Sequence, residues 1–314
     1  MASDRQRLAI LISGRGSNMA ALLYAAQADD CPYRPVLVTG NKPRAAGLDL
    51  AEAEGVPVRR LDGRSATFWD DLDAALREAG ADFVALAGFM RIIPEDFLAR
   101  WAGRIANIHP SLLPRYKGTG VHEAVLAAGD TVTGASVHLV TPELDSGEIL
   151  GQVEVAVLPG DTPERLADRV LIAEHQLYPR VLSAHLARFT DPAWIEAQVA
   201  ARALALPETS ARTSHGAPAW HVGAKSSGKL FAILSVRHHG EEAIGLLVKG
   251  AGPEEAADLV AHRPELYFRP AYYAPAGWIG VRVDRPETDW DHVAEWLRRS
   301  WRACAPAATL KRAG

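Results

Sequence analysis

The chain has 314 residues, 48% of them hydrophobic and 23% charged, with a formal net charge of -4. This length exceeds one ordinary single-core domain and predicts two, and the negative charge excludes a global attraction to nucleic acid. No run approaches the roughly 18 uncharged apolar residues of a membrane span, and the first residues, MASDRQR, lack the apolar core of a secretory signal. We therefore expect a cytoplasmic protein.

Up to about residue 187, short apolar runs alternate with helical patterns. Strands are predicted at 8–12, 35–39, 56–60, 83–87, 105–109, 135–140 and 149–157. Helices are predicted at 17–28, 44–54, 67–79, 94–101 and 162–186. This alternation indicates an α/β fold in which a parallel or mixed sheet is covered on both faces by helices.

The composition changes near residues 189–192, and six of the eight tryptophans follow that point. Strand spacing there favours a hairpin-rich sheet with helices at both ends. We expect a first domain over residues 1–189 and a second, smaller α+β domain over residues 193–311. Cys31 and Cys304 lie far apart and fit neither a disulfide framework nor a metal knuckle.

The segment LISGRGSNMAALL places Gly14 and Gly16 between the first strand and the first helix. Unpaired N–H groups and the helix dipole attract anions there, and glycines let the backbone approach them closely. Ser17 and Asn18 add side-chain donors. The turn suits a phosphate, although Gly-x-Gly after a strand is also an ordinary tight turn. Met19 stands where a dinucleotide motif has its third glycine, which favours a monophosphate.

In RIANIHPSLLP, Asn107 and His109 are two residues apart on a predicted strand and share one face, and Pro110 ends the strand. Open α/β sheets bind ligands at the carboxyl ends of their strands. Asp145 lies in a loop between two later strands, and a carboxylate beside an imidazole orients the ring. Together the three groups could stabilise an oxyanion at an acyl carbon and move a proton. Strand-end capping and a simple turn are the structural alternatives.

Other catalytic arrangements find little support. No nucleophilic Ser or Cys motif stands nearby, and His109, His122, His138 and Glu123 lack compact metal-ligand spacing. The predicted chemistry is direct, metal-free acyl transfer.

These residues lie in a collinear series of motifs: LISGRGSN, LAGFMRIIP, NIHPSLLP, KGTGVHEAVLAAG, TGASVHLVTPELDSGEIL and AEHQLYP. Through them the first 187 residues resemble the glycinamide ribonucleotide formyltransferase family. The resemblance implies a Rossmann-like, mostly parallel sheet. It also implies that a formyl group passes from 10-formyltetrahydrofolate to the amine of 5-phosphoribosylglycinamide, in purine synthesis, through a tetrahedral intermediate.

The resemblance further implies a role for each matched position. The expected catalytic residues are Asn107, His109 and Asp145. The expected substrate-binding residues are Gly16, Ser17, Asn18, Met19, Ala20, Leu171, Ile172, Ala173 and Glu174. The residues expected to contact the folate co-substrate are Arg64, Met90, Arg91, Ile92, Ile93, Asn107, Thr141, Pro142, Glu143, Leu144 and Asp145. No metal is expected.

Related families leave an alternative open. Formyltetrahydrofolate hydrolase and methionyl-tRNA formyltransferase share the Asn, His and Asp core, so a formyltransferase or hydrolase acting on another substrate is the second hypothesis. SGRGSN directly after the first strand favours a small phosphorylated substrate. KGTGVHEA also lacks the histidine that the commonest bacterial pattern has at Gly120, which concerns the substrate loop rather than the chemistry.

Residues 193–311 resemble the MmcQ/YjbR-like family through LPE, KLFA, PELYF, WIGV and a closing WR. Members are often described as DNA-binding, so a DNA- or partner-binding module is a further hypothesis. Residues 191–314 hold 15 Lys and Arg against 14 Asp and Glu, about +1, which is slender support. A basic cluster does follow or lie on the last helix, where a solvated helix face explains it equally: Arg298, Arg299, Arg302, Lys311 and Arg312.

For two short motifs in this second region, a structural interpretation is favoured over a binding site. GAKSSGKL satisfies Gly-x4-Gly-Lys, but a strand pattern follows it where a nucleotide-binding loop must open a helix, so we predict a hairpin turn. His238 and His239 sit at the next turn, where a surface position is favoured over a metal site.

Overall fold

The structure is a computed structural model that describes residues 5–223, 228–237 and 243–313. The chain divides into two compact units, Met1–Ala187 and Arg188–Gly314. Each unit is described by itself. No helix in the described ranges combines the length and the apolar character needed to cross a bilayer.

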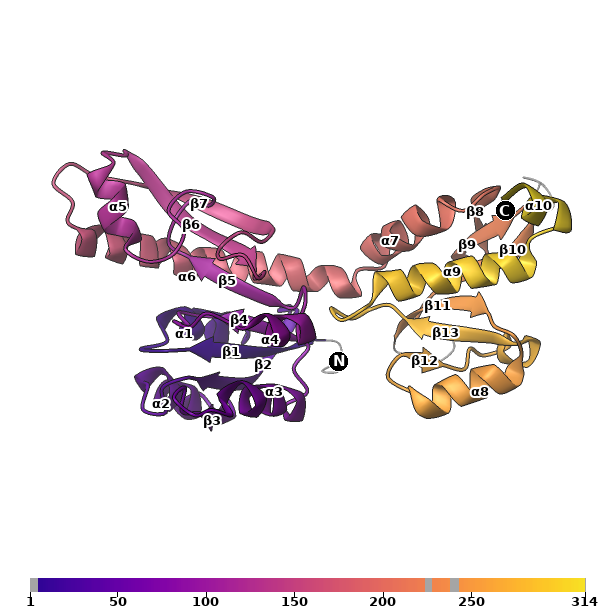
Figure 1. The fold of residues 1–314 in the computed structure, drawn as a ribbon, viewed down its shortest axis with the longest axis horizontal. Coiled ribbons are helices and arrows are strands. Elements are labelled where there is room, and N and C mark those ends of the chain that lie inside the picture. Colours follow the sequence, from indigo (N-terminus) through magenta and orange to yellow (C-terminus); the bar gives the residue numbers. More distant parts are fainter. Residues whose placement is uncertain (1–4, 224–227, 238–242, 314) are drawn as a thin grey trace. The chain divides into compact units, whose positions relative to one another are not determined.

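The first unit is built on a seven-stranded sheet with the strand order β3-β2-β1-β4-β5-β6-β7 (Figure 1). Its strands are β1 (Gln6–Ile12), β2 (Tyr33–Gly40), β3 (Val58–Arg60), β4 (Phe83–Leu86), β5 (Ile105–His109), β6 (Val132–Leu139) and β7 (Ile149–Ala156). The first five pair in parallel, whereas β6 and β7 pair antiparallel. The predicted mostly parallel α/β sheet is confirmed.

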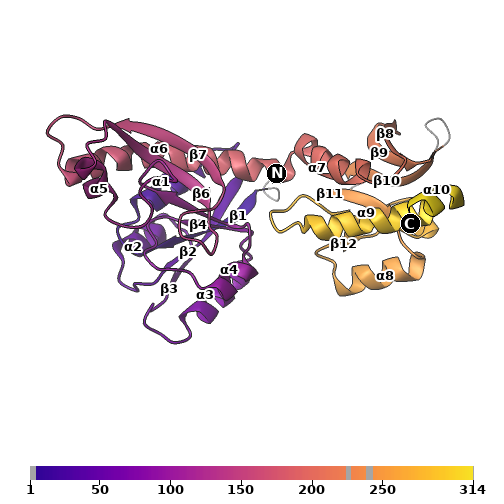
Figure 2. The same ribbon diagram turned by 45° about the horizontal axis from the view of Figure 1, so that its top comes forward.

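Six helices accompany this sheet: α1 (Ser17–Ala25), α2 (Ala46–Ala53), α3 (Phe68–Glu78), α4 (Glu95–Arg100), α5 (Val121–Ala127) and α6 (Pro163–Ala187). Phe68 of α3 and Phe97 of α4 belong to one core with Leu11 of β1. α6 covers the opposite face, where the Tyr178 hydroxyl donates to the carbonyls of Leu86 and Ala106 at 3.1 Å each. Figure 2 shows α1 beside α6, with α3 and α4 across the sheet. Helix α5 was not predicted, because its seven residues carry too short an apolar pattern.

The second unit begins with η1 (Arg188–Thr190) and holds a six-stranded antiparallel sheet in the order β12-β13-β11-β10-β9-β8. Its other elements are α7 (Pro192–Leu204), β8 (Thr209–Ser214), β9 (Ala217–Val222), β10 (Lys229–Val236), β11 (Ile244–Lys249), α8 (Pro253–His262), β12 (Tyr267–Phe268), η2 (Ala274–Ala276), β13 (Trp278–Arg282), α9 (Trp290–Cys304) and α10 (Ala307–Ala313). Ile195 of α7 and Trp301 of α9 pack with Trp220 of β9 in one buried core. The predicted α+β class is confirmed.

The two short motifs of this unit fall partly outside the described residues. Of GAKSSGKL, residues 224–227 are not described, but β9 and β10 on either side pair antiparallel, with Lys229 opposite Val222. His238 and His239 also lie outside the described residues, so their predicted position at the surface stays a prediction.

Candidate active site

The register of the parallel strands brings the opening turn and the imidazole to one edge. Leu11 of β1 pairs with Leu86 of β4, and Leu86 pairs with Asn107 of β5. The glycine turn follows β1 and His109 ends β5, so only β4 separates them, a lateral distance of about 10 Å at ordinary strand spacing. This is within the span of one small nucleotide.

At the opening turn, Gly16 is the N-cap of α1 and has a φ of 78°, a left-handed conformation that favours glycine. The first helical hydrogen bond runs from the Ala20 amide to the Gly16 carbonyl at 2.8 Å. The amides of Ser17, Asn18 and Met19 precede that bond and have no partner within the helix. The turn thus has the donor arrangement that the sequence predicts for an anion.

Asn18 connects this turn to α6. Its Nδ2 donates to Oε2 of Glu174 at 2.7 Å, and both residues are buried. Asn18 Oδ1 is also buried and has no hydrogen-bond partner among the described residues. Burial raises the pKa of Glu174, against the opposing hydrogen bond from Asn18. Of the residues predicted on α6, Glu174 is therefore brought to the turn, whereas Ile172 is 61% exposed.

His109 is buried and faces oxygen acceptors at both ring nitrogens. Its Nε2 lies 2.8 Å from the carbonyl oxygen of Tyr116, which can only accept, so this nitrogen donates. Its Nδ1 lies 3.5 Å from Oδ2 of Asp145. The predicted imidazole–carboxylate pair is present, and the ring orientation is fixed from both sides.

His138 is the residue of this cluster that the sequence interpretation missed. It pairs with Asn107 across β5 and β6, and its Nε2 lies 3.3 Å from Asn107 Nδ2 and 3.5 Å from Asp145 Oδ1. Its Nδ1 donates to the Leu139 carbonyl at 2.9 Å, so in the neutral ring Nε2 accepts from Asn107. The alternation in Ala-Ser-Val-His-Leu, combined with the strand predicted at 135–140, was the available signal.

Asp145 connects these groups from a left-handed backbone position with a φ of 47°. Burial acts to raise its pKa, but contacts with His138, a 2.9 Å hydrogen bond from the Gly118 amide and the nearby imidazoles outweigh burial and lower it. The side chain is therefore held as a carboxylate between two histidines. Lys117 stabilises the loop that carries Asp145, because its Nζ donates to Glu143 Oε1 at 3.4 Å and to Ser146 Oγ.

The predicted folate-contacting loops expose apolar side chains. Met90 is 73% exposed, Ile92 85% and Leu144 56%, whereas Ile93 is buried. The Met90 amide donates to Ser13 Oγ at 2.8 Å, which fixes this loop beside the end of β1. Thr141, Pro142 and Glu143 are also exposed. Exposed apolar side chains on two loops are typical of surfaces that receive an apolar ligand.

Arg64 lies apart from the histidine cluster. It pairs with Asp62 at 2.9 Å, its side chain is 90% exposed, and it lines a groove together with Arg91. The structure therefore places Arg64 with one of the predicted loop residues but not with Asn107 or His109.

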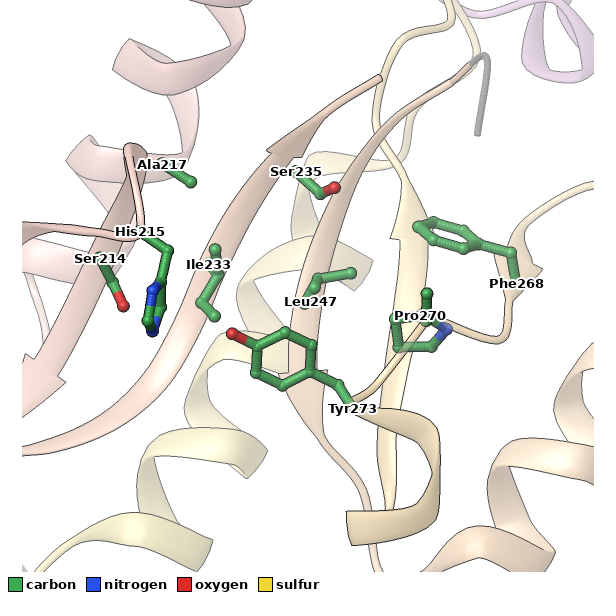
Figure 3. A pocket seen from close by; sticks show the side chains of 10 residues that line it. Ser214, His215, Ala217, Ile233, Ser235, Leu247, Phe268, Pro270 and Tyr273 are labelled. Carbon is green, nitrogen blue, oxygen red and sulfur yellow. The ribbon is translucent and has the colours of Figure 1, made fainter. Parts of the chain in front are cut away.

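The second unit has a small pocket of about 90 Å³ on its sheet (Figure 3). Ile233 and Leu247 form apolar parts of its lining, and the hydroxyl of Tyr273 points toward Ile233 and His215. None of the ten lining residues is a lysine or arginine. This chemistry does not suit a phosphate.

The basic cluster of the second unit is largely ion-paired. Arg298 lies 2.7 Å from Glu295, Arg299 lies 2.5 Å from Glu255, and Arg312 lies 2.6 Å from Glu208. These pairs reduce the positive field that a nucleic-acid backbone would meet.

The first unit has a doubly wound sheet. On one edge of that sheet lie a turn with free amide donors and an Asn–His–Asp cluster around the buried His109. These features define the unit as an α/β enzyme domain. Residues 6–182, more than half of the chain, match the formyl transferase family, and the chain belongs to that family. Residues 204–303 match the YjbR family. Both resemblances seen in the sequence are confirmed.

Several relatives cover the first unit. The chain is 38% identical over 202 residues to a phosphoribosylglycinamide formyltransferase of Escherichia coli, across 61% of this chain and 94% of that protein. It is 46% identical over 182 residues to the trifunctional purine biosynthetic protein adenosine-3 of Bos taurus, across 57% of this chain but only 18% of that protein. A crystal structure of phosphoribosylglycinamide formyltransferase from Brucella melitensis is 46% identical with a TM-score of 0.56, covering 58% and 96% of the two chains.

Proposed function

We propose that the first unit transfers the formyl group of 10-formyltetrahydrofolate to the amine of 5-phosphoribosylglycinamide. The observation that carries this proposal is the placement of an anion-type turn and a buried imidazole–carboxylate pair on one sheet edge, with a single strand between them. The names of the relatives that match nearly their full length support the same reaction.

In this proposal Gly16, Ser17, Asn18, Met19 and Ala20 bind the ribose phosphate at the start of α1. Glu174, with Leu171, Ile172 and Ala173 beside it on α6, lies toward the glycinamide end. The amine that is bound there is delivered to the formyl carbon next to His109.

The chemistry uses three side chains. The amine nitrogen attacks the formyl carbon, and the second N–H of Asn107 donates to the oxygen that becomes negative. The C–N10 bond then breaks, and the proton lost by the amine reaches N10 through His109 and water. Asp145 holds the imidazole and stabilises its protonated form during this transfer. Every bond change occurs between the two substrates, and the protein supplies donors and a proton path.

The loops fit a folate co-substrate. A pterin is a flat, largely apolar ring system with polar edges, and Met90, Ile92 and Leu144 offer exposed apolar contacts. The remaining residues proposed to line this pocket supply backbone groups or second contacts: Arg91, Ile93, Thr141, Pro142 and Glu143. Arg64 is proposed to contact the glutamyl end.

The decisive assay uses the purified full chain with both substrates and measures tetrahydrofolate release together with the mass of the formylated product. Release that depends on the glycinamide substrate supports the proposal. Release in its absence supports the hydrolase alternative instead, and no release at high enzyme concentration contradicts both.

Glu174→Gln is expected to raise the melting temperature but to weaken binding of the glycinamide substrate. Because the folded-state pKa is raised, the folded chain binds more protons, and the free energy of unfolding falls as pH rises through that pKa. The variant should therefore melt a few degrees higher at pH 7.5, with the gain shrinking toward acidic pH. KM for the glycinamide substrate should rise roughly 10- to 100-fold, as for loss of a charged hydrogen-bond partner.

Calorimetric melting across pH and steady-state kinetics test this pair of effects. The exposed Glu196→Gln in the second unit is the matched control and should change neither quantity. A lower Tm for Glu174→Gln at pH 7.5 would contradict the inferred cost of the buried carboxylate.

For the second unit, we expect no measurable binding of the full chain to duplex DNA even at low salt. Three arginines of its basic cluster form ion pairs with Glu295, Glu255 and Glu208. No lysine or arginine lines the pocket described above. Fluorescence anisotropy with a labelled duplex between about 20 and 200 mM salt measures this, because phosphate contacts give a steep salt dependence. Tight, salt-sensitive binding would restore the nucleic-acid hypothesis.

We propose the cytoplasm as the compartment in which the protein acts.

A further inference from the structure

The sheet of the second unit has two unlike faces. On one face, α7 and α9 pack over bulky side chains such as Trp220 and Leu246. On the other face, Ile233 pairs with Leu247, and the residues around this pair are small. The pairing register places five of them there: Ala217, Ala219, Ser235, Gly245 and Gly280. Small side chains leave this face hollow, and the pocket of about 90 Å³ lies on it.

Phe268 forms a wall of this pocket and lies directly on two glycines. Its ring extends from β12 over Gly280 of β13 to Gly245 of β11, and a Cβ at either glycine would collide with the ring. A glycine within a strand often marks such a close approach. Arg282 also lies over the ring, 5.6 Å from its centre. The aromatic wall is therefore held in place by the strands beneath it.

The polar part of the lining can form hydrogen bonds but offers no charged side chain. Ser214, Ser235 and Tyr273 contribute hydroxyls, and His215 contributes an imidazole (Figure 3). No hydrogen bond joins these three hydroxyls to another described residue. None of the ten lining residues is Asp, Glu, Lys or Arg. The Tyr273 ring packs against Trp278 at 5.6 Å, which helps to hold its hydroxyl in place.

Two residues at the pocket have left-handed backbone conformations, which are uncommon for residues other than glycine. His215 has a φ of 51° in the two-residue turn between β8 and β9, where asparagine or glycine is the usual choice. Tyr272 has a φ of 66°, lies between two lining residues and is 81% exposed. Of the six such non-glycine positions among the described residues, two more, Tyr116 and Asp145, lie at the candidate active site. Strained positions of this kind cluster at ligand sites.

We propose that this pocket binds the ring of an uncharged, planar nitrogen heterocycle of the size of a nucleobase. The apolar floor and the Phe268 wall accept a flat ring. The hydroxyls pair with ring nitrogens and exocyclic groups, whereas a hydrocarbon ring would leave them without partners. A charged ring would find no counter-charge in the lining.

The size of the pocket limits the ligand to one ring system. Its volume of about 90 Å³ lies far below the roughly 300–1,000 Å³ of sites for drug-sized ligands. The inference concerns the second unit alone and does not depend on formyl transfer.

The test titrates the full chain with adenine, hypoxanthine and uracil and follows binding by ligand-observed NMR. At least one base should bind with a Kd of roughly 10 µM to 1 mM, a range within reach of a ligand of about ten non-hydrogen atoms. Benzoate, a planar ring with a charge, should bind at least about 10-fold more weakly, because its carboxylate would lose water without gaining a cationic partner. A short single-stranded oligonucleotide is titrated in parallel.

A first pair of variants assigns the binding to this pocket. Ser235→Leu places a larger side chain in the hollow and should weaken binding of the base at least about 10-fold. Thr213→Leu is the matched control, because Thr213 is exposed and precedes Ser214 on β8, so its side chain lies on the other face. This control should leave the Kd unchanged.

A second pair tests the hydrogen bonds without filling the pocket. Tyr273→Phe removes only the hydroxyl and should weaken binding roughly 2- to 10-fold. Tyr24→Phe, at an exposed tyrosine of the first unit, is its control and should have no effect. A melting curve for each variant separates loss of the pocket from misfolding.

Binding of a base that Ser235→Leu weakens and Thr213→Leu preserves supports the inference. Binding that is unchanged in both Ser235→Leu and Tyr273→Phe lies elsewhere in the chain and overturns it. Benzoate binding as tight as that of the bases, binding of the oligonucleotide alone, or no binding of any base up to about 5 mM also overturns it. None of these results changes the expected release of tetrahydrofolate, so the proposed function is tested separately.

Discussion

Replacement of His109 by alanine is expected to lower kcat by about 10²- to 10⁴-fold, the scale of removing a positioned acid–base group. The imidazole is the central member of the cluster, with the Tyr116 carbonyl at 2.8 Å on Nε2 and Asp145 at 3.5 Å on Nδ1. Alanine offers neither a proton carrier nor a counter-charge for Asp145. Single-turnover measurement of product formation isolates this step from product release.

Folate binding should largely survive in the same variant, because the apolar contacts come from the loops that carry Met90, Ile92 and Leu144. Equilibrium titration with a folate analogue measures this directly. The exposed His262→Ala in the second unit serves as the control and should keep full turnover. A His109→Ala enzyme with undiminished kcat would show that another group moves the proton.

Asp145→Asn should cost about as much turnover, roughly 10²- to 10⁴-fold, as when an amide replaces the carboxylate that orients a catalytic imidazole. The carboxylate lies 3.5 Å from both His109 and His138 and accepts from the Gly118 amide at 2.9 Å. An asparagine keeps the size but presents a donor to one of these three groups, so the imidazole loses its charged partner.

The expected signature of Asp145→Asn is a fall in kcat with little change in KM for the glycinamide substrate, because the phosphate turn and Glu174 are untouched. Asp168→Asn, an exposed position on α6, carries the same loss of charge and should behave as the unaltered enzyme. A change confined to KM would move Asp145 from the proton path to substrate binding.

The sequence predicted the sheet well because its strands are apolar runs bounded by turn residues. β5 matches its predicted limits, Ile105 to His109, and α1 begins at Ser17 as predicted. Helix α5 was missed because seven residues give no readable periodicity, and its start depends on a left-handed Gly120 at a φ of 71°. Position-dependent backbone conformations of this kind have no counterpart in hydrophobic patterning.

The site was predicted in part. Side chains alternate between the two faces of a strand, so Asn107 and His109, two residues apart, share one face. This spacing can be seen in the sequence alone. The place of His138 depends on the pairing between two strands, and that register is a property of the fold. The groove that Arg64 and Arg91 line likewise joins residues 41–44, 62–64 and 91, which are distant in sequence and are brought together by the fold.

The register between β5 and β6 limits where residues can be inserted or deleted in this domain without moving His138. The edge of β6 that pairs with β5 places His138 opposite Asn107. A shift of β6 by one residue would turn the imidazole to the other side of the sheet. The pairing of β6 with β7 already has an irregularity between Val137 and His138 of β6, and His138 still pairs with Asn107. Length changes in the connection between residues 110 and 131 are therefore expected only outside residues 116–118, because the Tyr116 carbonyl and the Gly118 amide hold His109 and Asp145. An insertion at residues 136–138 is expected to abolish turnover.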